Sequence, residues 1–446
     1  MCRKNKIGGK QMKRKMVSCM LTAVMVGTFA TGLPVLASEN EAADIGTPFD
    51  ETVKISFITY KPEIVDQLQA GADIFGEKYN VEVEVIGTNS SELVTQRYAS
   101  GDPATLVMHN IATTRSLAQE GKTIDLSDLK CAETGGKDYG YWYEDKLYGL
   151  PFTTEAKGLL YNKTAIESCI GREFNPDDYI TVEQFKDLLE ELKENGMESP
   201  VILTNFEAAY GSHPLQQFYI LQDGTAETAK AFLKGINEGT NSFKDNQPFQ
   251  QVLDLYDVLI ENNINKSDPL SADYDINANY LAEGEAAFWL NGSWAWPDVR
   301  EYAPEDSEFG LMHLPSDNEA VQGKIAATAN QYLMIDGEKA TEDQQKAAKM
   351  LVDWYIFTEE GQDTLINQCD VVLPYTNIAI KPNGPFNKSV TEYIENDRNM
   401  DGVLYMPADH TSTLAPEIQA YLAGVSGRDE LAEALDAYWS TRLPNE

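Results

Sequence analysis

Tryptophan, the largest aromatic residue, is concentrated in one short stretch of this chain. The stretch FWLNGSWAWPD, residues 288–298, contains Trp289, Trp294 and Trp296, three of only six tryptophans in the sequence. Trp289 lies in an apolar run, which predicts a core position. Trp294 and Trp296 follow Asn-Gly-Ser, where the backbone turns. We therefore predict that these two rings lie at the mouth of a cleft.

Aromatic rings beside polar groups are suited to binding sugars. The C–H faces of a sugar stack on flat rings, while its hydroxyl groups need hydrogen-bond donors and acceptors. A second aromatic stretch, YGYWYEDKLYG, has five rings in residues 139–149. Ligands of open α/β folds bind beyond the carboxyl ends of the strands. Tyr60, His109 and Asn110 stand at two such predicted strand ends.

Motifs for catalysis and for cofactors are missing from the sequence. It contains no GxGxxG, Walker A, GxSxG or HExxH pattern, and its four histidines are far apart. Among 71 acidic residues, a carboxylate pair of the kind that glycosidases use occurs by chance. We predict a protein that is not an enzyme, with no catalytic residues and no cofactor. A secreted glycoside hydrolase stays as the alternative, because glycosidases often lack short motifs.

Two acidic stretches have part of the pattern of a calcium-binding loop. DYDINAN (273–279) lacks the turn glycine, and DRNMDG (397–402) lacks the closing glutamate. We interpret both stretches as exposed polar turns. No CxxC pair or Cys/His cluster indicates another metal site, so we predict none.

The elements that position these residues follow an α/β pattern. Strands are predicted at 53–60, 81–87 and 103–110, separated by amphipathic helices at 62–80 and 90–102. This alternation predicts a parallel sheet with helical crossovers.

Later segments continue the α/β pattern without a clear linear boundary. Residues 146–152 and 157–163 are predicted as two strands joined by a short turn. Residues 181–196 form the clearest helix, with a Thr cap and a Gln three residues later. Residues 341–368 are predicted as two helices. The 446 residues are too many for one comfortable domain, so we expect two lobes built from interleaved segments.

The first 37 residues are predicted to be a signal peptide. Seven lysines and arginines precede a short apolar run, which ends in small residues at Ala37. Residues 38–50 are predicted to be a linker. Without the signal peptide the formal charge changes from −36 to −43, which repels nucleic acid and anionic lipids. Three cysteines then remain, so at most one disulfide forms, and whether Cys131 pairs with Cys169 stays open.

Three stretches and the order of elements carry a resemblance to a known family. They are KLYGLPFTTEAKGLLYNK, AEGEAAFWLNGSWAWPDV and TEEGQDTLINQ. Nearly the whole chain after residue 37 resembles the extracellular solute-binding proteins of bacterial carbohydrate ABC transporters, the maltose-binding-protein-like group. The resemblance implies an α/β clamp of two lobes, each a sheet flanked by helices, with the chain crossing between lobes more than once. It implies a monomer that closes on an oligosaccharide and delivers it to the permease.

The resemblance also implies the residues that bind the ligand. Trp294 would stack on a sugar ring, with Trp296 second, and Glu155 would accept sugar hydroxyls. The remaining positions are strand ends, a loop of the second lobe and a return through the hinge: Tyr60, Lys61, His109, Asn110, Tyr210, Asn330 and Gln331.

The domain boundaries follow from the same resemblance. Lobe 1 is expected to comprise residues 51–155 and about 327–380, and lobe 2 about 156–326 and 381–446. Two departures from the family matter. No cysteine follows the predicted cleavage site, so we expect an exported protein, extracellular or at the cell surface, with no evident lipid anchor. The late stretch where maltose binders carry a cleft tryptophan has Tyr405 as its only ring, so maltose is not assumed. The same fold with a non-sugar ligand, such as a polyamine or a peptide, is a further alternative.

Overall fold

The computed structural model describes residues 45–136, 139–203, 217–269, 272–378, 380–400, 404–407 and 409–444. The predicted signal peptide and residues 38–44 of the linker lie outside them. Residues 45–50 contain no helix or strand, and Ile45 is buried in a hydrophobic core. Their role as a linker stays a prediction. Within the described ranges, no helix has both the length and the apolar character that a membrane span requires.

One mixed sheet runs through the described part of the chain, with its main strands in the order β2-β1-β3-β9-β5-β7-β6. The predicted parallel segment is confirmed. Strand β1 (Val53–Thr59) pairs in parallel with β2 (Val81–Gly87) and with β3 (Leu106–Asn110). Helices α1 (Val65–Tyr79) and α2 (Glu92–Ser100) connect these strands.

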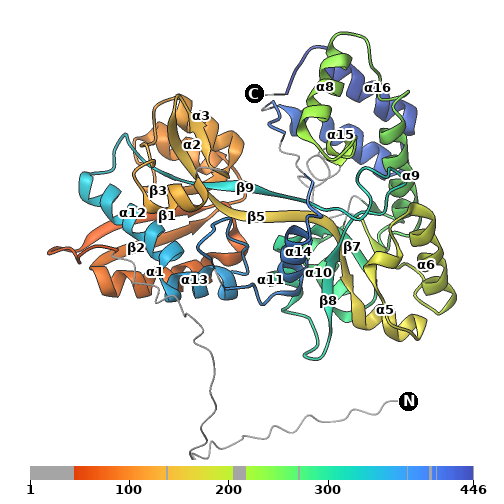
Figure 1. Cartoon of the computed structure of the whole chain (residues 1–446), viewed down its shortest axis with the longest axis horizontal. Coiled ribbons are helices and arrows are strands. Elements are labelled where there is room, and N and C mark those ends of the chain that lie inside the picture. The colour runs from red at the N-terminus through yellow and green to blue at the C-terminus, as the bar shows by residue number, and fades with distance from the viewer. Residues whose placement is uncertain are drawn as a thin grey trace, which may run out of the picture. The chain divides into compact units, whose positions relative to one another are not determined.

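Two long strands continue the sheet beyond this parallel segment. Strand β5 (Lys146–Asn162) lies antiparallel to β9 (Ala326–Ile335), and β9 is also antiparallel to β3. Figure 1 shows β5 and β9 side by side. The prediction of two strands joined by a turn was wrong, because β5 is one strand of 17 residues. The Pro-containing segment there produces two register shifts, between Pro151 and Thr154, instead of a turn.

Three further strands extend the sheet around β5. Strands β7 (Phe288–Gly292) and β8 (Phe309–Met312) are antiparallel to β5, and β6 (Val201–Ile202) is parallel to β7. Strand β4 (Tyr141–Tyr143) forms a hairpin with the start of β5. All five residues of β7 are buried, and Trp289 is completely buried, as predicted.

Helices flank the sheet, and most of them begin and end close to the predicted residues. The capping box of α6 (Val182–Glu194) is present, with Thr181 and Gln184 bonded as predicted. Residues 341–368 form α12 (Glu342–Phe357) and α13 (Glu359–Asp363), followed by one π-helical turn. The other helices of eight or more residues in the described part of the chain are α3 (Ile111–Gln119), α5 (Lys163–Ile170), α8 (Ala226–Asn237), α9 (Gln247–Glu261), α10 (Tyr274–Glu283), α14 (Pro385–Glu395), α15 (His410–Leu422) and α16 (Arg428–Trp439).

Two large hydrophobic cores lie against different parts of β5 and β9. One core gathers side chains of β1, β2, β3, α1 and α12 around Leu150 of β5 and Leu333 of β9. The other gathers side chains of α6, α8, α9, α15 and α16 around Leu159 of β5. A smaller cluster packs Leu160 of β5 with Ala327 of β9. Strands β5 and β9 thus each contribute side chains to more than one hydrophobic cluster.

The three described cysteines are free. Cys131 and Cys369 are buried, and Cys169 is half-buried. The possible pair of Cys131 and Cys169 therefore does not form in this structure.

Candidate functional site

The side chain of Trp294 is oriented by the end of strand β7. Gly292 is the last residue of β7, and the short helical turn Ser293–Ala295 follows at once. A β-carbon on Gly292 would lie 2.0 Å from a ring carbon of Trp294, so the ring rests directly on the Gly292 backbone. The absence of a side chain at Gly292 thus fixes where the half-buried Trp294 ring lies.

Glu155 is the centre of a buried polar network beside Trp294. The Lys61 ammonium donates to Glu155 Oε1 at 2.7 Å, and the Asn330 amide donates to Oε2 at 2.7 Å. Lys61 also pairs with Glu63 at 2.7 Å. Only 3% of Lys61 and 8% of Glu155 are exposed. Both carboxylate oxygens of Glu155 are therefore held in place.

Burial and ion pairing act on Lys61 in opposite directions. Burial by itself would lower the pKa of Lys61, but the neighbouring Glu155 and Glu63 raise that pKa above its ordinary value. Lys61 is therefore charged throughout the neutral range, and the carboxylate of Glu155 keeps its cationic partner.

Trp294, Glu155 and Asn330 line one cavity of about 120 Å³. By the space that one buried water needs, this volume holds on the order of ten water molecules. The wall is mostly apolar, with three aromatic rings. The remaining lining residues are Ile111, Lys157, Gln217, Ile220, Leu221, Leu314, Lys324, Ala326, Thr328, Ala329, Tyr332, Met400, Leu404 and Tyr405.

A second cavity, of about 10 Å³, shares Trp294 and Glu155 with the first. Lys61 and the buried Asp370 also line it. Its volume is that of about one water molecule. Only the larger cavity has room for an organic ligand.

Tyr60, His109 and Asn110 come together, but none of them lines either cavity. The rings of Tyr60 and His109 lie 4.1 Å apart between centroids. The backbone N–H of Asn110 donates to His109 Nδ1 at 2.9 Å, and the Asn110 side chain caps α3. Burial lowers the pKa of His109 to about 4, so its ring is neutral at pH 7. The next residue, Ile111, does line the larger cavity. Ligand contact by Tyr60, His109 and Asn110 stays a prediction.

Three further predicted site residues are placed outside the cavities or are not described. Trp296 packs against Phe309 and Phe386, with ring centroids 5.6 and 5.5 Å apart. Gln331 is buried within β9, where it pairs with β3 and β5. Tyr210 lies outside the described residues. Ligand contact by these residues stays a prediction.

Several cavity residues were not found from the sequence. Lys157 follows Glu155 by two positions in β5, and Tyr332 follows Asn330 by two in β9. Side chains two apart in a strand share a face, so strand periodicity could have identified both. Gln217 and Lys324 come from distant segments with no pattern that would single them out.

The acidic stretches noted in the sequence do not form a metal site within the described ranges, where no group of three metal-ligating side chains occurs. The interpretation of 273–279 as an exposed turn was wrong. Asp273 caps α10 by accepting the backbone N–H of Ile276 at 3.0 Å, and the following residues are helical. An Asp at a helix N-terminus satisfies free N–H groups, which accounts for the pattern without a metal. Of the second stretch, residues 401 and 402 lie outside the described residues.

A mixed sheet flanked by helices thus carries a cavity with aromatic and polar walls, an arrangement suited to binding a small solute. The family model of bacterial extracellular solute-binding proteins matches residues 70–383. The chain therefore belongs to this family.

A curated relative matches part of the chain. The multiple sugar-binding protein of Streptococcus mutans serotype c (strain ATCC 700610 / UA159) is 26% identical over 177 residues. These are 39% of this chain and 40% of that protein, so the match spans less than half of the relative's length.

Solved structures match much more of the chain, at low identity. RafE, a solute-binding protein in complex with raffinose, aligns with a TM-score of 0.68 and 20% identity, over 87% of this chain and 99% of that chain. A sugar transporter of Bacillus licheniformis in complex with stachyose gives a TM-score of 0.66 and 16% identity, over 87% and 99%. The predicted fold class, the two-lobed α/β fold of this family, is confirmed.

Proposed function

We propose that this chain is the substrate-binding component of an ABC importer and that it captures an oligosaccharide in the 120 Å³ cavity. The observation that carries the proposal is the Trp294 ring, held against Gly292 beside the Glu155–Asn330 pair. A flat ring next to fixed polar atoms offers a stacking surface for the C–H face of a sugar and partners for its hydroxyl groups.

Features beyond the Trp294 ring also support a saccharide ligand. Tyr332 and Tyr405 add two more rings to the cavity wall, and Gln217 and Thr328 add uncharged polar groups. The relatives named above include a multiple sugar-binding protein and structures that hold raffinose and stachyose. Glu155 would accept sugar hydroxyls with the lone pairs that Lys61 and Asn330 leave open.

We further propose the lobes 51–155 with about 327–380, and about 156–326 with 381–446. Strands β5 and β9 pass between separate hydrophobic cores, which supports a hinge near residues 155 and 327. Ligand binding would close the two lobes about that hinge. The closed form would then dock on the permease.

Export is part of the proposal as well. The basic and apolar pattern of residues 1–37 supports a cleaved signal peptide, and the family description is extracellular. An importer subunit of this kind works outside the cytoplasmic membrane as a monomer with no cofactor.

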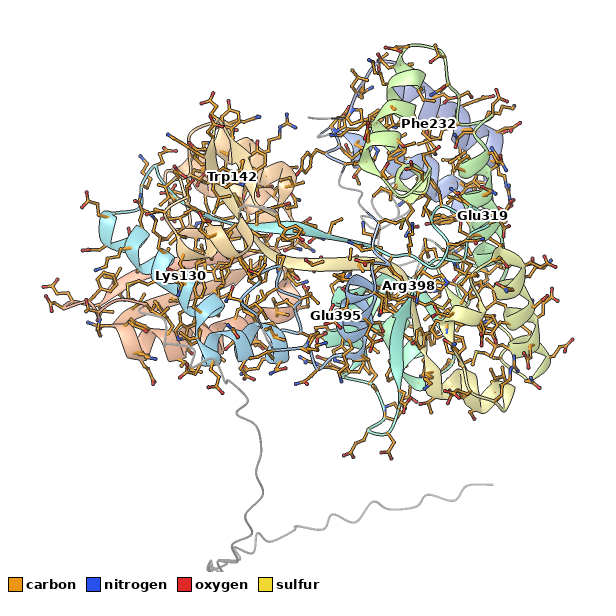
Figure 2. The ribbon with its side chains drawn as sticks, in the orientation of Figure 1. Lys130, Trp142, Phe232, Glu319, Glu395 and Arg398 are labelled. Atoms are coloured by element: carbon orange, nitrogen blue, oxygen red, sulfur yellow. The ribbon has the colours of Figure 1, made fainter. Side chains whose placement is uncertain are left out.

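Calorimetry and tryptophan fluorescence of the purified chain against a panel of oligosaccharides test this function. Micromolar binding that leaves the sugar intact by chromatography, and that falls at least about tenfold in Trp294→Ala, is the expected result. The variant Trp142→Ala serves as a control, because this exposed ring, labelled in Figure 2, is not among the residues that line the cavity. Cleaved sugar would favour the glycoside hydrolase, and binding of only amines or peptides would favour a non-sugar solute.

A further inference from the structure

The charged residues that line the 120 Å³ cavity do not balance. They are one acid, Glu155, and two bases, Lys157 and Lys324. The whole sequence has 71 acidic and 35 basic residues, so chance would place more acids than bases in any cavity wall. An excess of lysine in this wall therefore indicates that the ligand of the cavity carries a negative charge.

The single acid of the cavity is already engaged by other groups. Lys61, which does not line this cavity, donates to Glu155 Oε1, and Asn330 donates to Oε2. The pair with Lys61 is almost fully buried and therefore little screened by solvent. Lys61 also pairs with Glu63, so its one positive charge offsets part of the negative charge of Glu155. The cavity wall itself still carries two bases against one acid.

Lys157 is directed to the cavity by the strand that carries it. It follows Glu155 by two positions in β5, so both side chains emerge on one face of the strand. Its partners across the ladder are Gly292 of β7 and Ala326 of β9, neither of which carries a charge. Burial lowers the pKa of Lys157 to about 8, and nearby Glu155 partly offsets this effect. An anion in the cavity would favour the charged form of Lys157.

Lys324 is held at the cavity by its backbone. Arg398, labelled in Figure 2, donates through Nε to the carbonyl of Gly323 at 2.7 Å. Arg398 itself is paired with Asp177, at 2.6 and 3.0 Å. The Lys324 ammonium donates to the neutral carbonyl of Ala320 at 2.9 Å and also lies within electrostatic range of Asp223.

We infer that the ligand is a saccharide with an anionic group, either the carboxylate of a uronic acid or a sulfate ester, bound by Lys157 and Lys324 while Trp294 stacks on its ring. This inference rests on the proposed function and specifies its ligand class. A lysine ammonium is a point charge with three donors, so it suits both carboxylate and sulfate oxygens.

Calorimetry with three probes of equal length tests the inference: a galacturonic acid trisaccharide, a sulfated galactose trisaccharide and the neutral galactose trisaccharide. At least one anionic probe is expected to bind about tenfold or more tightly than the neutral one, as a charge-assisted hydrogen bond implies. Which anionic probe binds better identifies the anionic group. Equal or tighter binding of the neutral trisaccharide would overturn the inference and leave the proposed function standing. Binding of no saccharide in the wider panel would overturn both.

Substitutions separate the lysines from general effects of charge. Lys157→Met and Lys324→Met are each expected to reduce the preference for the anionic probe about tenfold. Lys230→Met is the matched control, because it removes the same charge from an exposed position on α8. Circular dichroism and thermal unfolding show whether each variant folds. An unchanged preference in the folded double variant of Lys157 and Lys324 would overturn the inference.

The pH profile of binding distinguishes a contact with Lys157 from a purely structural role. A bound anion favours the charged form of Lys157, so affinity for the anionic probe should fall as the pH rises through about 8. The charged groups facing Lys157 among the described residues are Glu155 on its own strand and Lys324 across the cavity. In Lys157→Arg the fall should disappear, because arginine stays protonated in this range. A fall of the same size in Lys157→Arg would assign it to another group.

Discussion

The contact between Gly292 and Trp294 predicts that a single methyl group on strand β7 weakens ligand binding. In Gly292→Ala the new β-carbon would lie 2.0, 2.2 and 2.4 Å from three ring carbons of Trp294. The backbone at Gly292 is extended, with φ −129° and ψ 169°, which alanine adopts without strain. The substitution therefore acts on the ring and leaves the backbone of β7 as it is.

The size of the effect follows from the distance that the ring must move. Carbon atoms attract best at about 3.5–4.0 Å, so the Trp294 ring must retreat by about 1.5 Å. A gap of 1 Å already removes a quarter to a half of each contact energy with a stacked ligand. Losing most of a stacking contact of about 1–1.5 kcal/mol lowers the affinity about tenfold. Overpacking should also lower the free energy of unfolding by about 1–3 kcal/mol.

A double-mutant cycle is the appropriate assay, with affinity measured by calorimetry and stability by urea unfolding. Gly292→Ala should lower the affinity in the native chain and have no further effect in the Trp294→Ala background, because the ring through which it acts is gone. Gly427→Ala is the matched control, since its new β-carbon would meet only the mobile end of the Glu430 side chain. Equal losses of affinity from Gly292→Ala with and without Trp294 would refute the reasoning.

Three other predictions concern the frame around the site. Lys61→Met leaves the buried Glu155 without its cation. Urea unfolding should show a free energy of unfolding lower by about 3 kcal/mol. A loss below about 1 kcal/mol would show that the Lys61–Glu155 pair is effectively solvated. Thr181→Ala removes the α6 capping box and should lower that free energy by about 1 kcal/mol with ligand affinity unchanged; a change in affinity would contradict a purely local role. Burial lowers the pKa of three buried histidines to about 4, so NMR titration should find their rings neutral at pH 5.5. Their contribution to the free energy of unfolding should be lost as the pH falls from about 6.5 to about 4. Titration midpoints near 6.5 would contradict this prediction. These histidines are His109, His313 and His410.

The parts of the fold that were predicted correctly are those whose signals are local. Helix α6 has its cap, its apolar stripe and its stop within one short stretch, and β1, β2 and β3 alternate with helices along the sequence. The prediction for β5 was wrong because it placed a turn between residues 152 and 157, whereas the chain there continues as one strand with register shifts between Pro151 and Thr154. Pairing with β9 on one side of β5, a long-range contact, keeps the strand continuous.

The predicted site residues differ in how far their position depends on tertiary contacts, and this decides which of them line the cavity. Trp294, Glu155 and Asn330 line the cavity, and all three were predicted from the family resemblance. Trp296 was placed beside Trp294 by its position in the sequence alone. The helical turn after β7 sends its ring toward Phe309 and Phe386 instead, away from the cavity.

The sequence by itself determined the class of fold and the acidic charge of the chain, and it predicted Trp294, which lines the cavity. Periodicity, caps and composition act over a few residues, so they can be read without coordinates. Only the tertiary structure decided that Lys61 and Asn330 occupy the two oxygens of Glu155, and that Lys157 and Lys324 face the same cavity. Glu155 and Asn330, for example, are 175 residues apart in the chain. The register of β5 against β7 and β9 brings them together, and no local signal encodes that register.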